Sequence, residues 1–323
     1  MAVTIKDVAK KANVSYSTVS RILNNLPGYS EETKRKVEKV IEELGYQPNE
    51  IARGLINRKT KTIGVLVPGV SDLFVSEILD GIEEQARKSG YSVMICKTKY
   101  RTKDYLQTLY EKRVDGIIMI SGSIDQESYK EIEIKDVPVV IVAGKSKYPK
   151  IPYININEYQ ASYDAVKYLV EKGHSHIGMI AGTKNDDREK GFKDALNDNG
   201  INVSNHMITY GNYHFDSGVR AMEELIINYP SITGVFCASD EMAVGALSCL
   251  YKQGIKVPEQ ISIIGFDNTA TAKKAIPPLT TVAQPLYEMG ESAVKLLIDP
   301  SLKENKNYPY FIAERDTVHS FNE

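Results

Sequence analysis

The sequence is poor in the residues that disulfide and metal chemistry require. It has three cysteines and five histidines among 323 residues. Cys96, Cys237 and Cys249 are odd in number and lie in apolar runs without metal-ligand spacing, so we predict buried thiols in a reducing compartment. His174 and His176 are one residue apart, with no carboxylate or third histidine nearby in the sequence. A turn is therefore favoured over a metal site.

Catalytic motifs are also lacking. Gly144-Lys145-Ser146 has the ending of a phosphate-binding loop, but Val139 stands where the leading glycine is required. The sequence contains no nucleophile elbow and no helix motif with paired histidines. We therefore predict that the protein is not an enzyme and needs no cofactor.

Long apolar runs are absent, and none approaches the roughly 20 residues of a membrane-spanning helix. The N-terminus opens into a predicted helix rather than a signal sequence. We therefore expect no membrane partner and a cytoplasmic location. A secreted sugar-binding protein could share much of the pattern described below, but it would need a signal sequence.

The length of 323 residues, with 42% hydrophobic and 25% charged residues, predicts one or two α/β domains plus an appendage. Charge is distributed unevenly along the chain. Residues 1–60 carry 11 lysines and arginines against 7 acidic residues, a balance of +4, whereas residues 61–323 carry 29 against 35, a balance of −6. The basic part is the one suited to meet nucleic-acid phosphates.

Residues 4–25 contain two helix-start signals, each followed by apolar residues at helical spacing. Thr4 and Ser15 are each placed to cap a helix, and the break at residues 12–14 is too short for a strand. In the second helix the apolar face carries Val19, Ile22 and Leu23, and the opposite face carries Tyr16, Ser17, Ser20 and Arg21. This is a helix-turn-helix pattern.

The polar face of the second helix suits a DNA major groove. A guanidinium can read guanine, a hydroxyl can read a base edge, and an aromatic ring can meet a thymine methyl or a phosphate. The alternative is a small helical subdomain with an ordinary solvated face, because such patterns recur by chance. A third helix follows, capped by Ser30 and ended by Gly45, with Glu31 and Glu32 at the positive end of its dipole.

The same stretch carries a series of specific motifs: Val14-Ser15, Ser20-Arg21-Ile22-Leu23-Asn24, Glu32-Thr33, Leu44-Gly45-Tyr46, Pro48-Asn49 and Ala52-Arg53-Gly54-Leu55. With these motifs it resembles the DNA-binding headpiece of the lac repressor/galactose repressor family of bacterial transcription regulators. The predicted DNA contacts are Thr4, Ser15, Tyr16, Ser17, Thr18, Ser20, Arg21, Asn24, Asn49, Ala52 and Leu55.

Residues 49–60 have a weak helical pattern that is too short to be stable alone in water. The resemblance implies a hinge helix that folds in pairs in the minor groove and pushes Leu55 between base steps. A flexible linker is the alternative. Gly54 lowers the helical stability of this segment by about 1 kcal/mol relative to alanine.

From residue 61 onward, short apolar runs alternate with amphipathic helices. Strands are predicted at 63–67, 91–96, 116–120, 138–142, 177–180, 235–238 and 261–266, with residues 280–284 following. Helices are predicted at 75–88, 104–112, 159–172, 188–199, 217–228, 241–253 and 286–298. This alternation predicts doubly wound parallel sheets covered on both faces.

The resemblance continues through this region, at Asp115-Gly116-Ile117-Ile118, Gly173-His174, Gly191-Phe192, Ser239-Asp240-Glu241-Met242-Ala243, Ile263-Ile264-Gly265-Phe266-Asp267 and Pro278-Leu279-Thr280-Thr281-Val282. It implies a two-lobed core like that of periplasmic sugar-binding proteins, with three crossings between lobes. The predicted domains are a headpiece (1–48), a hinge (49–60) and a core (61–323). Within the core, lobe 1 covers about 61–158 and 284–300, and lobe 2 about 159–283 and 301–323.

Ligands of such cores bind beyond the carboxyl ends of the strands, in the cleft between lobes. The predicted effector contacts are Phe74, Asn157, Arg188, Tyr213, Ser239 and Asp267. Arg188 and Asp267 can each fork two hydrogen bonds to vicinal hydroxyls, and the aromatic rings can stack on a sugar face. Asn157 stands where the family usually has aspartate. Asp240 opens a helix and is expected only to cap it.

We therefore predict a cytoplasmic, homodimeric repressor that binds a palindromic operator, is nucleoid-associated when bound, and responds to a small ligand. The hypothesised ligand is an inducing sugar, for example a maltose-type glucoside. One alternative is a corepressed or phosphocarrier-protein-dependent catabolite regulator. The other is a sugar-binding or sugar-modifying protein without DNA function.

Overall fold

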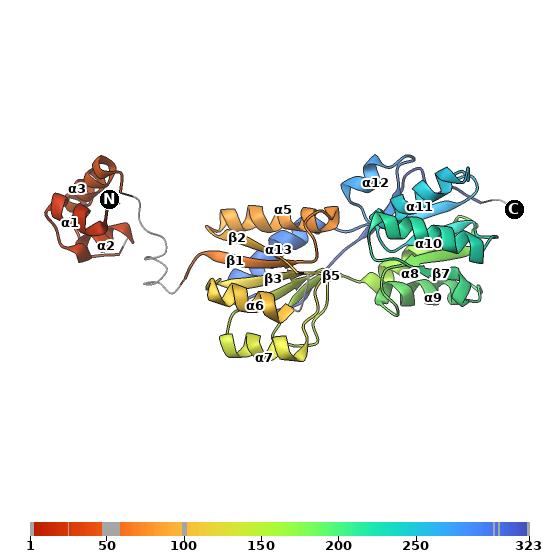
Figure 1. The fold of residues 1–323 in the computed structure, drawn as a ribbon, viewed down its shortest axis with the longest axis horizontal. Helices are drawn as coiled ribbons and strands as arrows, with labels where there is room; N and C mark the ends of the chain where they lie inside the picture. Colours follow the sequence, from red (N-terminus) through yellow and green to blue (C-terminus); the bar gives the residue numbers. More distant parts are fainter. Residues whose placement is uncertain are drawn as a thin grey trace. The chain divides into compact units, whose positions relative to one another are not determined.

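The computed structural model describes residues 3–24, 26–46, 59–98, 102–299, 301–302 and 304–321. The chain divides into two compact units, Met1–Lys61 and Thr62–Glu323 (Figure 1). The first is the headpiece and the second is the core. Most of the predicted hinge, residues 49–58, lies outside the described residues.

The headpiece consists of three helices, α1 (Ile5–Ala12), α2 (Tyr16–Leu23) and α3 (Glu31–Leu44). Ser15 and Ser30 cap α2 and α3 as predicted, because their hydroxyls accept hydrogen bonds from backbone amides three residues later, at 3.0 and 3.2 Å. Gly45 ends α3 in the left-handed conformation, at φ 59°. One small core holds the helices together, formed by Val8, Ala9, Ala12, Val19, Ile22, Val37, Val40 and Tyr46.

The first lobe of the core is a six-stranded sheet in the order β11-β5-β4-β3-β1-β2, in which all neighbouring strands are parallel. Its strands are β1 (Thr62–Val67), β2 (Ser92–Lys97), β3 (Gly116–Ile120), β4 (Val139–Val142), β5 (Tyr153–Ile156) and β11 (Lys306–Tyr308). Its helices are α5 (Leu73–Lys88), α6 (Thr102–Glu111), α7 (Gln126–Lys135) and α13 (Leu286–Ile298).

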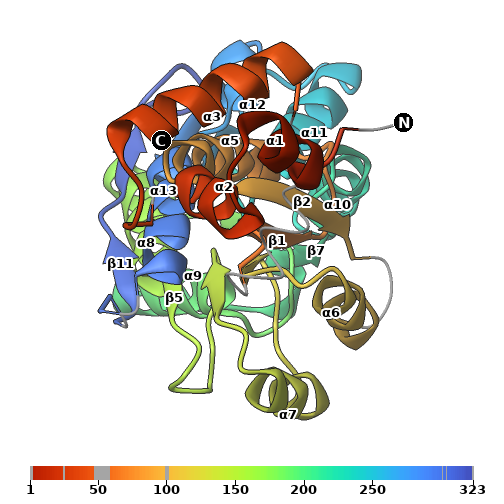
Figure 2. The same ribbon diagram turned by 90° about the vertical axis from the view of Figure 1, so that its left-hand side faces the viewer.

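Successive side chains of these strands face opposite helix layers. Val65 and Ile118 belong to the cluster that contains α5 and α13, whereas Leu66 and Ile117 belong to the cluster under α6 and α7. Figure 2 shows α6 and α7 on one side of the sheet and α5 and α13 on the other. The sheet is therefore buried on both faces, which explains why its strands read as continuous apolar runs.

Two glycines let α13 pack closely on α5. A Cβ at Gly81 would lie 2.0 Å from the carbonyl oxygen of Tyr287, and a Cβ at Gly290 would lie 2.2 Å from that of Ile78. The two helix backbones are thus in direct contact. This contact fixes α13 in the first lobe, as the resemblance implied for the helix after residue 281.

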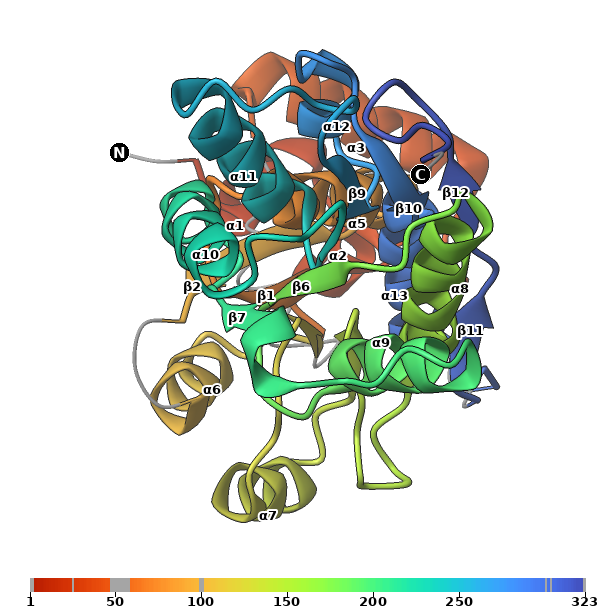
Figure 3. The ribbon, with the colours of Figure 1, turned by 90° about the vertical axis from the view of Figure 1, so that its right-hand side faces the viewer.

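The second lobe is a sheet in the order β12-β10-β9-β8-β6-β7, with α8 and α9 on one face and α10 and α11 on the other (Figure 3). Its strands are β6 (Ile177–Ala181), β7 (Ile208–Tyr210), β8 (Gly234–Cys237), β9 (Ser262–Asp267), β10 (Thr280–Ala283) and β12 (Phe311–Ala313). Its helices are α8 (Glu158–Glu171), α9 (Asp187–Asp198), η1 (Asn205–Met207), α10 (Phe215–Asn228), α11 (Asp240–Lys252) and α12 (Ala270–Lys274).

The chain crosses between the lobes three times, from β5 to α8, from β10 to α13 and from β11 to β12. One predicted lobe boundary is wrong here. β11 pairs with β5, so residues 306–308 belong to the first lobe rather than the second. β12 runs antiparallel to β10, so the second sheet is not wholly parallel. Both strands have only three residues, which is too short for a periodic signal in the sequence.

Candidate functional site

The outer face of α2 presents polar and aromatic side chains. Tyr16 is 49% exposed, and Ser17 and Arg21 are also exposed, whereas Val19 and Ile22 on the opposite face are buried. This is the division that the spacing predicted. The headpiece therefore offers a phenol, a hydroxyl and a guanidinium on one helical surface.

Other predicted DNA contacts are engaged within the headpiece. The Ser15 hydroxyl caps α2 and lies 2.8 Å from the Thr18 hydroxyl. The Asn24 side-chain amide donates to the Ser20 carbonyl at 2.7 Å. These groups position the backbone of α2, and any DNA contact from them competes with these bonds.

The Thr4 hydroxyl donates to the Asp7 carboxylate at 2.6 Å, and the Thr4 amide donates to the same oxygen at 2.8 Å. Thr4 and Asp7 thus form a capping box at the start of α1. The predicted contacts Asn49, Ala52 and Leu55 lie outside the described residues.

The second candidate site is the interlobe junction, where the carboxyl ends of strands from both lobes meet. Lys145, which follows β4 of the first lobe, forms an ion pair with Asp187 at the start of α9. On α5, the Glu77 carboxylate accepts a hydrogen bond from the Ala270 amide of the second lobe at 3.1 Å. These contacts join the two lobes beside the residues that the sequence predicts as effector contacts.

Arg188 is buried at this junction and held on three sides. Its Nη2 and Nε donate to Glu158 Oε1 at 2.7 and 3.2 Å, and its Nη1 donates to the Ala238 carbonyl. The guanidinium carbon lies 3.8 Å from the centre of the Phe266 ring. Burial opposes the charge, but Glu158 and Asp267 outweigh it and raise the pKa of Arg188. Arg188 is therefore a cation held in place by the protein. It is not free to donate two hydrogen bonds to vicinal hydroxyls, as the sequence had suggested.

Asp267 ends β9 in a strained backbone conformation, with φ 118°. Its carboxylate is buried and accepts a hydrogen bond from Gln284 Nε2 at 2.8 Å. Burial raises the pKa of Asp267 well above its usual value; Asp240 and Asp72 raise it further, and Arg188 opposes them. The influence of Asp72 comes from the first lobe.

Aromatic rings from both lobes border the junction. Tyr213 has φ 67° and its ring covers Gly182, where a Cβ would lie 2.0 Å from a ring carbon. Its hydroxyl lies 3.4 Å from the Asp186 carboxylate. Phe74 is half-buried, and its amide donates to the Asp72 side chain at 3.0 Å, so Asp72 caps α5. Contact of either ring with a ligand stays a prediction.

Two predicted hydrogen-bonding residues are helix caps. Ser239 Oγ accepts from the Met242 amide at 3.2 Å and caps α11, and Asn157 Oδ1 accepts from the Gln160 amide at 3.2 Å and caps α8. Asn157 is exposed, whereas Ser239 is buried. Their contact with a ligand stays a prediction.

Asp240 is not the cap that the sequence predicted, because Ser239 occupies that position. Its buried carboxylate accepts hydrogen bonds from the Thr281 hydroxyl at 2.6 Å and from the amide and hydroxyl of Thr269 at 2.7 and 3.1 Å. Asp240 thus joins α11 to β10 and to the loop after β9. These bonds hold β10 and the loop after β9 in place beside Asp267, the last residue of β9.

Comparison with known proteins places this architecture. Residues 4–49 match the family model of bacterial regulatory proteins of the lacI family, and residues 166–310 match that of a periplasmic binding protein-like domain. The chain is 39% identical over 312 residues to catabolite control protein A of Priestia megaterium, covering 94% of each chain. It belongs to the lacI family. Like its relatives, it is a DNA-binding transcription regulator rather than an enzyme.

A second relative is the HTH-type transcriptional repressor CytR of Escherichia coli strain K12, which is 40% identical over 306 residues and covers 92% of this chain and 89% of its own. The lac repressor dimer bound to operator and the anti-inducer ONPF is similar in structure, with a TM-score of 0.87, 28% identity and coverage of 99% and 100%. The complex of the regulator CelR with cellobiose has a TM-score of 0.74, 28% identity and coverage of 98% and 99%. The lacI-family fold predicted from the sequence is confirmed.

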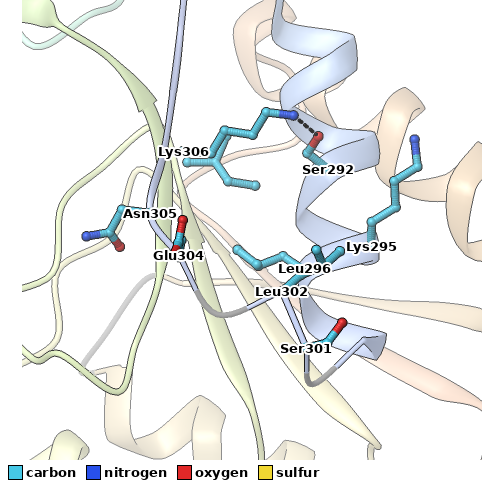
Figure 4. Close-up of a pocket in the computed structure, with 9 residues that line it drawn as sticks. Ser292, Lys295, Leu296, Ser301, Leu302, Glu304, Asn305 and Lys306 are labelled. Carbon is cyan, nitrogen blue, oxygen red and sulfur yellow. Dashed lines mark hydrogen bonds between the residues drawn. The ribbon is translucent and has the colours of Figure 1, made fainter.

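A separate hollow of about 440 Å³ lies on the first lobe between α13 and β11 (Figure 4). Leu296 and Leu302 point into it, and Lys295 and Lys306 stand at its rim. Lys306 Nζ donates to the Ser292 hydroxyl at 3.2 Å. No predicted effector residue lines this hollow, so it is distinct from the interlobe junction.

Among the described residues, no group of three or more histidine, cysteine, aspartate or glutamate side chains is arranged to hold a metal. His174 and His176 instead bond Thr233 and Tyr229, each at 3.0 Å. No helix in the described part of the chain is long and apolar enough to cross a membrane.

Sequence reasoning missed three junction residues, Asp72, Glu158 and Gln284. Asp72 precedes α5, Gln284 follows β10, and Glu158 is the first residue of α8. That signal alone does not separate a ligand contact from a helix cap. The pairing of Glu158 with Arg188 becomes visible only when the two helices are packed together.

Proposed function

We propose that this lacI-family regulator is a homodimeric repressor whose affinity for a palindromic operator is controlled allosterically by a sugar bound at the interlobe junction. The observation that carries the proposal is the junction itself. Arg188 lies near Asp267 and Tyr213 of the second lobe, and the charge of Asp72 in the first lobe acts on Asp267. A ligand held there would contact both lobes at once. A ligand that prefers one arrangement of the lobes shifts the population of that arrangement.

The exposed face of α2 supports the DNA-binding half of the proposal. Tyr16 and Arg21 are exposed, and Ser17 is exposed beside them, although its hydroxyl lies 2.7 Å from the capping hydroxyl of Ser15. We assign base reading to these three residues. Two headpieces would read the two half-sites of the operator. The hinge, residues 49–60 with Leu55, would link DNA to the core. We place this activity in the cytoplasm, with the protein nucleoid-associated when bound.

The sugar class is supported by two facts. The junction offers carboxylates, a guanidinium and two rings, a combination suited to a polyhydroxylated molecule. In addition, a similar regulator, CelR, has been solved with cellobiose. We infer that the sugar, for example a maltose-type glucoside, acts as an inducer. Ligand-free protein that fails to bind its operator would refute the inducer sign.

A second candidate is a corepressed catabolite regulator that needs a phosphocarrier protein. The 39% identity to catabolite control protein A favours it over other corepressed regulators. Titrating operator affinity against sugars and against the carrier separates the two. A sugar-dependent loss of affinity supports the first candidate, and a carrier-dependent gain supports the second.

The test of the DNA-binding function begins with an operator selected from a random duplex library by the full chain. Fluorescence anisotropy then compares the full chain with a variant lacking residues 1–60. We expect the deletion to abolish operator binding while sugar binding by the core persists. Operator binding that survives the deletion would contradict the proposal, and sugar binding without any operator binding by the full chain would favour a plain sugar-binding protein.

A further inference from the structure

The side chain of Arg21 lies against the loop that joins α2 to α3. A Cβ at Gly28 in this loop would lie 2.4 Å from Arg21 Nη1, 3.6 Å from Cζ and 3.8 Å from Cδ. The outer half of the arginine side chain therefore runs alongside the backbone of Gly28. Arg21 is still exposed, and among the described residues none accepts a hydrogen bond from its guanidinium. Its donors remain available to a base.

The loop that carries Gly28 is anchored on both sides. Before Gly28, the Leu26 amide donates a hydrogen bond to the Arg21 carbonyl at 2.9 Å. After it, the Tyr29 ring packs on the core of the headpiece, and the Ser30 hydroxyl caps α3 by accepting from a backbone amide at 3.2 Å. Gly28 is therefore held in place relative to α2, and its backbone gives Arg21 a fixed surface.

Two properties of residue 28 call for glycine. Its φ is 114°, in the region that side-chain-bearing residues rarely adopt. In addition, any side chain would place a Cβ in the space that Arg21 Nη1 occupies, so the guanidinium would have to move. A long arginine side chain loses rotamer freedom when it binds a base. A contact that restricts the side chain before DNA arrives reduces that cost.

We propose that Gly28 is a positioning residue for operator recognition, because its bare backbone holds the Arg21 guanidinium where it reads one base pair. The inference rests on the proposed role of Arg21 in base reading. Gly28 acts through Arg21 and makes no base contact of its own. Its effect is therefore confined to the sequence-specific part of binding, since contacts to phosphates carry no direct sequence information.

The test uses the full chain and the operator that it selects. Each base pair of one half-site is replaced in turn, and fluorescence anisotropy gives the affinity for every duplex and for random DNA. Arg21→Ala identifies the base pair whose identity no longer matters. We expect Gly28→Ala to lower operator affinity about threefold or more and to weaken discrimination at that same base pair, while affinity for random DNA stays within about twofold.

Two comparisons separate positioning from backbone strain. Gly28→Asn adds the same Cβ in a residue that adopts positive φ more readily than alanine, and we expect the same loss of discrimination. Gly45→Ala removes another headpiece glycine with positive φ, 59°, but its Cβ meets nothing within 4 Å, so discrimination should be unchanged at every base pair.

A double-mutant cycle tests whether Gly28 acts through Arg21. When Gly28→Ala is added to Arg21→Ala, we expect operator affinity to change by less than about 1.5-fold, because no guanidinium is left to position. An equal loss in both backgrounds overturns the inference, and so does a loss of affinity for random DNA in both Gly28 variants, since Gly28 then serves only the fold of the headpiece.

Full discrimination in a Gly28 variant that binds random DNA normally also overturns the inference. Failure of the proposed function gives a different result. If Arg21→Ala alters preference at no base pair while the operator is still bound, base reading by Arg21 is wrong, and the positioning role of Gly28 falls with it. If the full chain selects no operator, the proposed DNA-binding function itself fails.

Discussion

Replacing Asp240 with alanine tests whether this carboxylate holds β10 and the loop after β9 in place at the interlobe junction. Its oxygens accept hydrogen bonds from the Thr281 hydroxyl and from the amide and hydroxyl of Thr269. Alanine leaves the buried Thr269 amide without an acceptor, at a cost of about 1–3 kcal/mol, and removes two bonds to a charged group. Burial raises the pKa of Asp240 to about 7, so the cost of its charge offsets part of this loss. We expect the free energy of unfolding to fall by about 2–4 kcal/mol.

Asp240→Asn separates shape from charge. The asparagine oxygen can accept from Thr269, and its NH₂ can donate to the Thr281 hydroxyl after that hydroxyl rotates. We expect a loss within about 1 kcal/mol at pH 7. Because the folded-state pKa of Asp240 is raised above 3.8, its contribution to stability is full below about pH 4 and is lost as the pH rises through about 7. The free energy of unfolding of the wild type should therefore increase when the pH is lowered from 7 to 5. This increase should be smaller in Asp240→Asn, which lacks the titrating carboxyl group.

The assay is urea unfolding of the full chain, followed by far-ultraviolet circular dichroism at pH 7 and pH 5. Glu224→Ala removes a charge from the exposed face of α10 and serves as a control, with an expected change within about 0.5 kcal/mol. Asp240→Ala variants that lose less than about 1 kcal/mol, or Asp240→Asn variants as unstable as the alanine variant, would refute the reasoning.

Three further predictions concern other parts of the chain. Gly290→Ala places a Cβ against the Ile78 carbonyl of α5 and should lower the free energy of unfolding by about 1–3 kcal/mol. Gly69→Ala adds a Cβ in open space and should leave the free energy of unfolding unchanged. Burial lowers the pKa of His174 to about 4, so the contribution of the neutral imidazole to stability is present above pH 6.5 and is lost as the pH falls toward 4. The difference in unfolding free energy between wild type and His174→Gln should therefore decrease as the pH is lowered from 6.5 to 4. Arg21→Ala should cost about 1–3 kcal/mol of operator affinity and relax preference at one base pair in anisotropy titrations, and equal losses on random DNA would contradict base reading.

The fold could be predicted where buried elements leave an apolar pattern in the sequence. Strands such as β3 and helices such as α13 are continuous apolar runs or stripes, because both faces of each sheet are covered. The helices α7 and α12 and the strands β5, β7, β11 and β12 were not predicted. β11 and β12 form by pairing with β5 and β10, and each is only three residues long, too short to leave a periodic signal.

The positions of the site were more predictable than its contacts. Asp267 was expected at the junction because it ends a strand, and Arg188 because of the family resemblance. Both residues are buried, and the charge of Arg188 acts on Asp267. The partner of each depends on how helices and strands pack. Glu158 lies 30 residues from Arg188 and Gln284 lies 17 from Asp267, and nothing local in the sequence links either pair.

The most direct measurement of the central claim is operator affinity of the full chain, titrated with a neutral sugar that binds the core, in wild type and in Asp267→Asn. The account predicts a change in operator affinity of about 5- to 150-fold on sugar binding, the range of a typical allosteric coupling. It also predicts that Asp267→Asn binds the operator normally without sugar and loses the response. A sugar that binds the core without altering operator affinity, or a full response that persists in Asp267→Asn, would contradict it.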